Sequence, residues 1–176
     1  MIKTKRLLIR PIKIEDASDM YEYAKNPIIG KMAGWKAHQD LKETISIIEM
    51  LIRIEETYSI VYENKMIGTI GLTTKPEEVV IGYALSQDYW NKGIMHEALK
   101  ATIIYLFTKT KNHTLVATTY LDNVKSQNVL LKLGFIFTDQ VDRLVDNIYV
   151  KFNLYKLKKD AYERKELPWQ NITTNT

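Results

Sequence analysis

The feature that most constrains the fold is a change of hydrophobic period in the first half of the chain. Residues 14–27 and 40–56 carry apolar side chains at helical spacing, whereas the sequence after residue 57 turns to short runs rich in β-branched and aromatic residues. Short polar turns separate these runs, so they predict three antiparallel strands in a meander. The predicted strands are 58–63, 66–74 and 79–85.

The flanking sequence adds further strands and helices. Lys5–Arg10 predicts a first strand, and Asp40 with Glu43 three residues later forms an N-cap pattern for the helix over 40–56. The remaining predicted elements are a loop over 28–38, a long helix after residue 93, strands over 114–120, 135–139 and 146–157, a helix over 124–133, and a polar tail from about residue 158. This order predicts one α/β, or α+β, domain with a mixed sheet.

Composition narrows the classes of function. The 176 residues are 45% hydrophobic and 26% charged, and no apolar run approaches the roughly 18 residues that span a bilayer. The basic start has too short an apolar stretch for a secretory signal, so we expect a cytoplasmic protein without a membrane partner. The absence of cysteine excludes thiol catalysis and thiolate metal sites. His38, His96 and His113 have no ligand spacing, so no metal is expected.

The net charge of +4 suits a protein that handles an anionic ligand, although scattered surface lysines would give the same sum. No basic groove interleaved with aromatic residues is visible, so nucleic-acid binding is not expected. A more local anion site is predicted where the strand over 79–85 leads into the next helix. Helix N-termini leave amides without partners, Gly93 lets a phosphate approach the backbone, and Asn91 and Lys92 can add donors. A glycine used only for packing is the alternative.

The same segment carries a family resemblance. IGYAL followed by YWNKGIMHEAL resembles motif A of the GNAT acetyltransferases, above all the ribosomal-protein N-terminal (RimJ/RimL-like) branch, whose usual form is IGYWL and then YWGKGYATEAL. Asn91, Met95 and His96 depart from that form. The resemblance implies that acetyl-CoA is the cofactor. The residues it assigns to the cofactor are Tyr83, Ala84, Leu85, Trp90, Asn91, Lys92, Gly93, Ile94, Met95, His96 and Glu97.

A second match lies downstream. Residues 115–135, LVATTYLDNVKSQNVLLKLGF, resemble motif B, in which Asn123, Ser126 and the closing Lys132, Gly134 and Phe135 occupy the pattern's positions. Taken singly, these residues would be ordinary helix caps. The resemblance covers about residues 4–162, which implies a GNAT domain over 1–162 and a polar tail over 163–176. It also implies a mostly antiparallel sheet of about six or seven strands with about four helices, and acetyl-CoA bound where two central strands splay apart.

The family reaction is direct acetyl transfer to an amine. Backbone N–H groups near Tyr83 to Leu85 are implied to hold the carbonyl, with Asn123 positioning the coenzyme and Ser126 as the acid that protonates the departing sulfur. Tyr120 is the competing acid. The general base is open between Glu78, which precedes the third meander strand, and Asp146 on the last strand. A surface carboxylate is the alternative for Glu77, Glu78, Asp139, Asp142 and Asp146, and a dedicated base is not required for a partly neutral α-amine.

The acceptor is less defined than the cofactor. A protein N-terminal α-amine is expected, or otherwise a small amine, and the family shapes its acceptor pocket with the loop over 28–39. Members of the branch commonly form homodimers, which makes a homodimer an expectation here. From another class, a catalytically silent acyl-CoA-binding sensor would also explain the departures at Asn91, Met95 and His96, and at Val80, where the branch often has an acidic residue.

Overall fold

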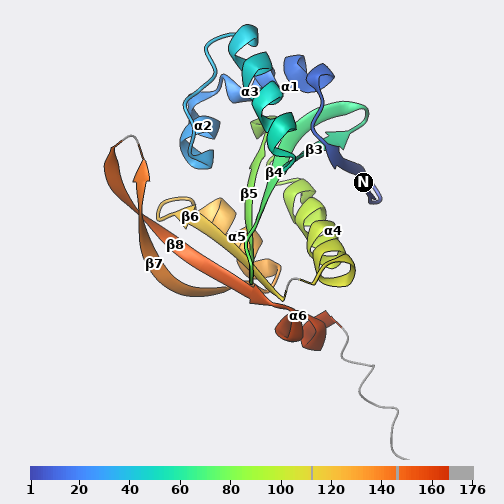
Figure 1. The fold of residues 1–176 in the computed structure, drawn as a ribbon, viewed down its shortest axis with the longest axis vertical. Helices are drawn as coiled ribbons and strands as arrows, with labels where there is room; N and C mark the ends of the chain where they lie inside the picture. Colours follow the sequence, from blue (N-terminus) through green and yellow to red (C-terminus); the bar gives the residue numbers. More distant parts are fainter. Residues whose placement is uncertain (112, 146, 167–176) are drawn as a thin grey trace, which may run out of the picture.

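The computed structural model describes residues 1–111, 113–145 and 147–166 and forms one mixed sheet with helices on both faces (Figure 1). Within these residues the sheet has eight strands, in the order β1-β2-β3-β4-β5-β6-β8-β7. The strands are β1 (Ile2–Lys3), β2 (Leu7–Pro11), β3 (Thr57–Tyr62), β4 (Lys65–Thr74), β5 (Val79–Leu85), β6 (Thr114–Tyr120), β7 (Ile136–Val145) and β8 (Ile148–Lys158). The predicted meander, β3 to β5, is therefore present.

One strand pair differs from all the others. β5 and β6 run parallel and pair only where Val79 and Val80 face Leu115 and Val116, whereas every other neighbouring pair is antiparallel. β5 remains paired with β4 along its whole length. Beyond Val80 the two central strands therefore diverge, and the backbone edge of β5 faces a gap between them.

The helices divide between the two faces of the sheet. They are α1 (Ala17–Ala24), α2 (Pro27–Ala33), α3 (Leu41–Ile54), α4 (Ile94–Lys109), α5 (Val124–Lys132) and α6 (Lys159–Glu166), with short 3₁₀ turns at Ile14–Asp16 and Gln87–Tyr89. Helices α1 to α3 share one apolar cluster with β4 and β5, and α4 and α5 share the larger cluster on the other face. Ile103 at the centre of α4 is fully buried in the larger cluster. Full burial of such a side chain contributes about 1.5–3 kcal/mol to the free energy of folding.

The structure corrects the expected numbers of strands and helices. Within the described residues there are eight strands and six α-helices, where about six or seven and about four were expected. Residues 28–38 were predicted as a loop, but α2 occupies most of this segment because the Asn26 side chain caps it, Pro27 begins it and Gly34 ends it in a left-handed conformation. Strand β7 is twice the expected length, since it pairs with β8 as far as Val145. The chain also continues past residue 162 as helix α6.

Candidate active site

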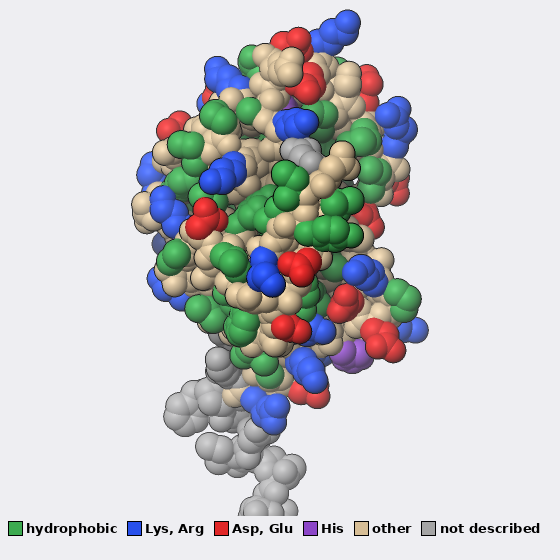
Figure 2. All heavy atoms as spheres, turned by 90° about the vertical axis from the view of Figure 1, so that its left-hand side faces the viewer, with side chains coloured by type: hydrophobic (Ala, Val, Ile, Leu, Met, Phe, Trp, Pro, Cys, Tyr) green, Lys and Arg blue, Asp and Glu red, His purple; other side chains and the backbone are tan. Residues whose placement is uncertain are grey.

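A groove of about 1240 Å³ opens where β5 and β6 diverge. Its walls come from five parts of the chain: α2, β5, the turn into α4, the β6–α5 junction and the β7–β8 hairpin. Figure 2 faces the hairpin and shows hydrophobic side chains across the middle of this side of the molecule, with charged side chains around them. The groove therefore has two ends, one at the start of α4, which we call the cofactor end, and one between α2 and the hairpin, which we call the acceptor end.

The cofactor end is built mainly from backbone. Asn91 and Gly93 have φ values of 61° and 70°, and this left-handed pair turns the chain sharply into α4. The first helical hydrogen bond runs from the Glu97 N–H to the Gly93 carbonyl, 3.0 Å away, so the preceding amides are those that helix geometry leaves without a carbonyl partner. Such amides together with the helix dipole favour an anionic group.

The turn is supported from behind by the connection between β1 and β2. The carboxylate of Glu97 accepts hydrogen bonds from the Thr4 hydroxyl (2.6 Å), the Arg6 N–H (3.0 Å) and the Arg6 Nε (2.6 Å). Arg6 also donates to the Lys92 carbonyl at 3.0 Å. Although burial alone would raise the pKa of Glu97, the donors from Thr4 and Arg6 lower it. Sequence reasoning missed Arg6, because nothing local indicates that it reaches a turn 86 residues away.

Trp90 closes one side of this turn. Its indole N–H donates to the Leu85 carbonyl at 2.9 Å, and the Lys125 ammonium lies 4.2 Å from the centre of its ring. The indole thereby joins β5, the turn and α5. His96 also lines the groove, on the first turn of α4.

Ser126 lines the groove from the first turn of α5. The Asn123 side chain caps this helix by accepting from the Ser126 N–H at 3.1 Å. The Ser126 hydroxyl lies 2.7 Å from the hydroxyl of Tyr83 on β5, and both residues line the groove. Burial raises the pKa of Tyr83 to about 12, against the opposing effect of the hydrogen bond with Ser126.

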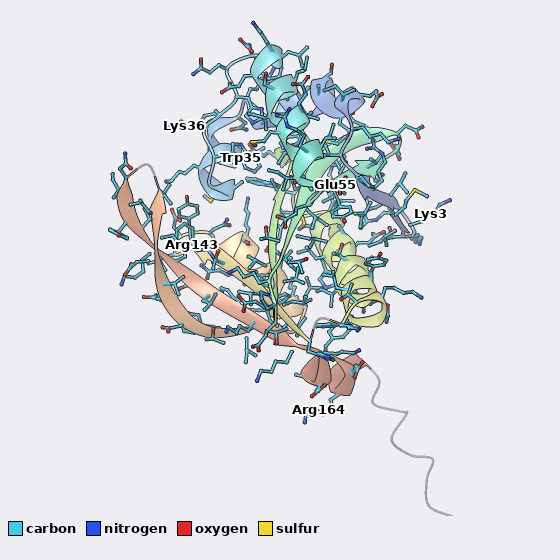
Figure 3. The ribbon with its side chains drawn as sticks, viewed as in Figure 1. Lys3, Trp35, Lys36, Glu55, Arg143 and Arg164 are labelled. Atoms are coloured by element: carbon cyan, nitrogen blue, oxygen red, sulfur yellow. The ribbon has the colours of Figure 1, made fainter. Side chains whose placement is uncertain are left out.

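The acceptor end combines aromatic and cationic side chains. Tyr120 on β6 packs against Phe152 of β8 with ring centroids 4.3 Å apart and the ring planes tilted by 43°. The Arg143 guanidinium of β7 lies 5.7 Å from the centre of the Phe152 ring. Arg143 lies on the hairpin below α2 (Figure 3). Across the groove, α2 contributes the apolar side chains of Ile28, Ile29 and Met32. The acceptor end is therefore an apolar channel with the positive charge of Arg143 at its side.

The predicted site residues do not all meet in the groove. The lining includes Tyr83, Ala84, Leu85, Trp90, Asn91, Gly93, Ile94, Met95, His96, Tyr120, Asn123 and Ser126. Lys92 and Glu97 are not part of it. Glu78 lies outside as well, in the turn before β5, where Lys75 is 3.5 Å from its carboxylate. Asp146 lies outside the described residues.

The groove suits a long ligand with an anionic end. Thr119 on β6 lines it, is only 3% exposed, and its hydroxyl has no hydrogen-bond partner within the described part of the chain. A buried hydroxyl of this kind normally finds a partner. On the edge that faces away from β4, β5 has no strand partner beyond Val80, so this edge offers further backbone groups. A Cβ at Gly82 would meet no atom within 4 Å. These groups match a slender polar chain whose phosphates rest on α4.

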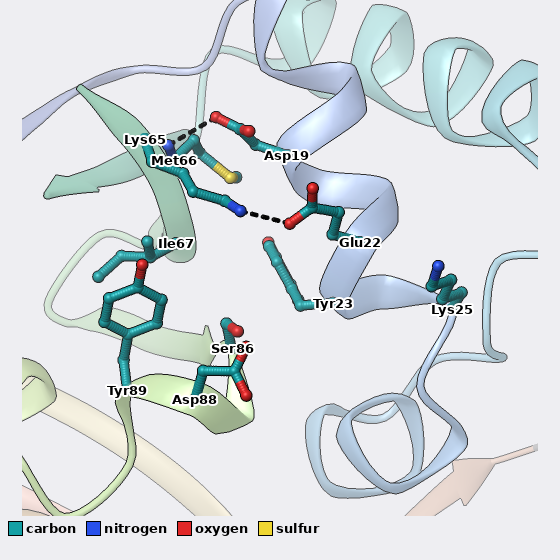
Figure 4. A pocket seen from close by; sticks show the side chains of 10 residues that line it. All are labelled: Asp19, Glu22, Tyr23, Lys25, Lys65, Met66, Ile67, Ser86, Asp88 and Tyr89. Carbon is teal, nitrogen blue, oxygen red and sulfur yellow. Dashed lines mark hydrogen bonds and ion pairs between the residues drawn. The ribbon is translucent and has the colours of Figure 1, made fainter. Parts of the chain in front are cut away.

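A second hollow, of about 280 Å³, lies between α1, the start of β4 and the turn at Ser86–Tyr89 (Figure 4). Two of its three acidic side chains are engaged with the protein itself. Glu22 forms an ion pair with Lys65, and Asp19 accepts from the Met66 N–H at 2.8 Å. This hollow is therefore a junction that holds α1 to β4. In the described ranges, no three His, Cys, Asp or Glu side chains cluster as a metal site requires.

Fold and groove together define the class of the protein, a single-sheet α/β domain with a long groove between two splayed central strands. Comparison with known proteins gives the family. Residues 6–136 match the acetyltransferase (GNAT) domain model, so the chain belongs to the GNAT family. The uncharacterized N-acetyltransferase YoaA of Bacillus subtilis is 26% identical over 152 residues, covering 77% of this chain and 82% of YoaA.

Solved structures agree on the fold. A GNAT-family acetyltransferase from Bacillus anthracis matches with a TM-score of 0.83 and 24% identity, covering 90% of this chain and 98% of that one. RimL, a ribosomal L7/L12 α-N-protein acetyltransferase solved with coenzyme A, matches with a TM-score of 0.77 and 20% identity, covering 90% and 97%. The chain is thus an acetyl-CoA-dependent N-acetyltransferase, as the sequence motifs predicted. No helix in the described ranges is long and apolar enough to span a membrane.

Proposed function

We propose that this enzyme transfers the acetyl group of acetyl-CoA to a primary amine, with a protein N-terminal α-amine as the preferred acceptor and a small amine as the other candidate. The observation that carries the proposal is the turn Trp90–Gly93, whose left-handed residues Asn91 and Gly93 line the groove and lead directly into the first amides of α4. These amides would hold the pyrophosphate, and the open edge of β5 would hold the pantetheine arm.

When bound, acetyl-CoA supplies an activated thioester: the acceptor nitrogen takes the acetyl carbon and loses a proton, while the sulfur loses that carbon and takes a proton. The protein's part is to orient the two reactants and to handle the protons. The Ser126 hydroxyl belongs to a residue that lines the groove, and the Asn123 cap fixes its backbone. We assign Ser126 as the proton donor. Tyr120, packed against Phe152 at the acceptor end, remains the competing donor.

The charges of the groove favour an acceptor amine that is already partly neutral. Among the described lining residues the only carboxylate is Asp122, and it lies 3.9 Å from the Lys31 ammonium. An α-amine with a pKa near 8 is about one tenth neutral at pH 7, whereas a lysine is neutral in less than about one molecule in a thousand. An α-amine therefore needs less help from a base. RimL, which is named as a ribosomal L7/L12 α-N-protein acetyltransferase, supports the choice of an α-amine acceptor.

A two-part experiment tests the proposal. Calorimetry would measure acetyl-CoA binding, and a thiol-release assay would measure turnover on peptides with free N-termini, on polyamines and on drug-like amines. A matched peptide with a blocked N-terminus and one internal lysine serves as the control. We expect binding, turnover on free N-termini, and little turnover on the control. Tight binding without turnover on any amine would instead indicate a cofactor sensor.

A further inference from the structure

We propose that the Tyr83 hydroxyl positions Ser126 by donating a hydrogen bond to its Oγ, which leaves the serine proton directed into the groove. Tyr83 is then a positioning residue with a role for its side chain, beyond the backbone contacts that motif A implies for this strand. The inference rests on the proposed function of Ser126 as the proton donor. It concerns how that donor is held.

The geometry brings together two residues that are 43 positions apart. Tyr83 projects from β5 and Ser126 from the first turn of α5, so their contact bridges the gap between the splayed strands. The two hydroxyl oxygens are 2.7 Å apart, and by distance alone either can be the donor. The Tyr83 hydroxyl can also donate to the Ser126 carbonyl, but over the longer distance of 3.3 Å. Asn123 holds the same serine through its N–H. Ser126 is thus fixed from both sides.

The direction of the hydrogen bond decides what the serine can do. A serine hydroxyl has one proton and two lone pairs, so a serine that donates to Tyr83 would have no proton for a group in the groove. When Tyr83 donates instead, the serine proton is available. Burial raises the pKa of Tyr83 to about 12, and therefore its phenol keeps its proton at neutral pH and remains a donor.

In this arrangement the Tyr83 proton is held in the hydrogen bond to Ser126, and the Ser126 proton is the one that faces the groove. Removing only the Tyr83 hydroxyl should therefore slow the chemical step and leave the cofactor site intact. The side-chain ring, which packs against the larger apolar cluster, stays in place in a phenylalanine variant.

Tyr83→Phe is the test, measured as kcat and KM for acetyl-CoA on the best acceptor from the wild-type amine panel. We expect kcat to fall about tenfold, the size of one lost hydrogen bond to a reacting group, with KM for acetyl-CoA changed less than about twofold. Tyr105→Phe is the matched control, because Tyr105 is an exposed residue of α4 outside the groove. It should match the wild type.

A double-mutant cycle separates positioning from a merely structural role. If Tyr83 acts through Ser126, then adding Tyr83→Phe to Ser126→Ala should cost less than about twofold more in kcat. A structural role would cost the same tenfold in both backgrounds. An equal tenfold cost in both backgrounds, or an unchanged kcat in Tyr83→Phe, would overturn the inference. Turnover by the wild type would still support the proposed function in either case. A wild type that acetylates no amine would overturn both.

Discussion

The two ends of the groove differ in how the chain builds them. The cofactor end comes mainly from one contiguous stretch, Trp90 to His96, and most of what it offers is backbone: two left-handed residues and the free amides of a helix start. The acceptor end is assembled from α2, the β6–α5 junction and the β7–β8 hairpin, and it offers side chains. A site made of backbone keeps its ligand as side chains vary, whereas a site made of side chains changes its ligand with each substitution.

Because of this difference, membership of the GNAT family defines the cofactor of the protein but not its acceptor amine. Asn91, Met95 and His96 depart from the usual motif, yet the turn keeps its left-handed residues and its amides. At the acceptor end, in contrast, the side chains of Tyr120, Arg143 and Phe152 come from three different strands. Variants can test whether the two ends are separable in this way.

The largest effect is expected from a change at Ser126. Ser126→Ala removes the proposed proton donor, so kcat should fall about 100-fold, the low end of general acid catalysis, while the Kd for acetyl-CoA changes little. Steady-state kinetics and calorimetry on the same variant measure both quantities. A wild-type rate would transfer the role to Tyr120 or to solvent.

Next in size is a change at the cofactor end. Gly93→Val forces a β-branched residue into a left-handed conformation, at a cost of about 2 kcal/mol, and its Cβ would lie 3.7 Å from the Arg6 guanidinium that braces the turn. We expect the Kd for acetyl-CoA to rise about 30-fold.

Gly71→Val is the control for this change, because a Cβ there would meet nothing closer than the Gly82 carbonyl at 4.0 Å. Its Kd should stay within about twofold of the wild type. Equal affinity in both variants would remove the turn from the account of cofactor binding.

These results also bear on what the sequence could reveal. The meander, helix α4 and the Asn123 cap were predictable because each depends on local period or on capping residues a few positions apart. Helix α2 was missed because Pro27 was taken as the end of one helix, whereas it begins another. Arg6 behind the turn and Tyr83 beside Ser126 were missed because both contacts join distant segments, and no local pattern encodes such a pairing.

A smaller effect is expected at the acceptor end. Arg143 lies beside the groove on β7, and among the described residues no carboxylate forms an ion pair with it. Arg143→Glu should lower kcat/KM about fivefold for peptides with an early acidic residue and leave acetyl-CoA binding unchanged. Arg164→Glu, on α6 and away from the groove, is the charge-matched control. Loss of cofactor affinity in Arg143→Glu would show that the two ends are coupled.

The smallest effect concerns pH. His38, between α2 and α3, is buried with its Nδ1 2.9 Å from the Thr44 hydroxyl, and burial lowers its pKa, opposed by Glu43. A lowered pKa means that the unfolded chain binds the proton more readily than the folded chain does. The stability associated with neutral His38 is therefore complete above about pH 6.5 and is lost as the pH falls. Between pH 7.5 and 5.5, wild-type Tm should fall about 2 °C more than that of His38→Asn. The exposed His113→Asn should behave as the wild type.

An amide NMR titration with coenzyme A reports most directly on the turn before α4. The amide resonances of residues 91–96 should shift by the largest amounts and saturate with the calorimetric Kd, while those of α2 should shift little. In the proposed binding mode the diphosphate rests on residues 91–96 and only an acceptor reaches α2. Binding of coenzyme A that leaves the resonances of residues 91–96 unmoved would contradict this account of the enzyme.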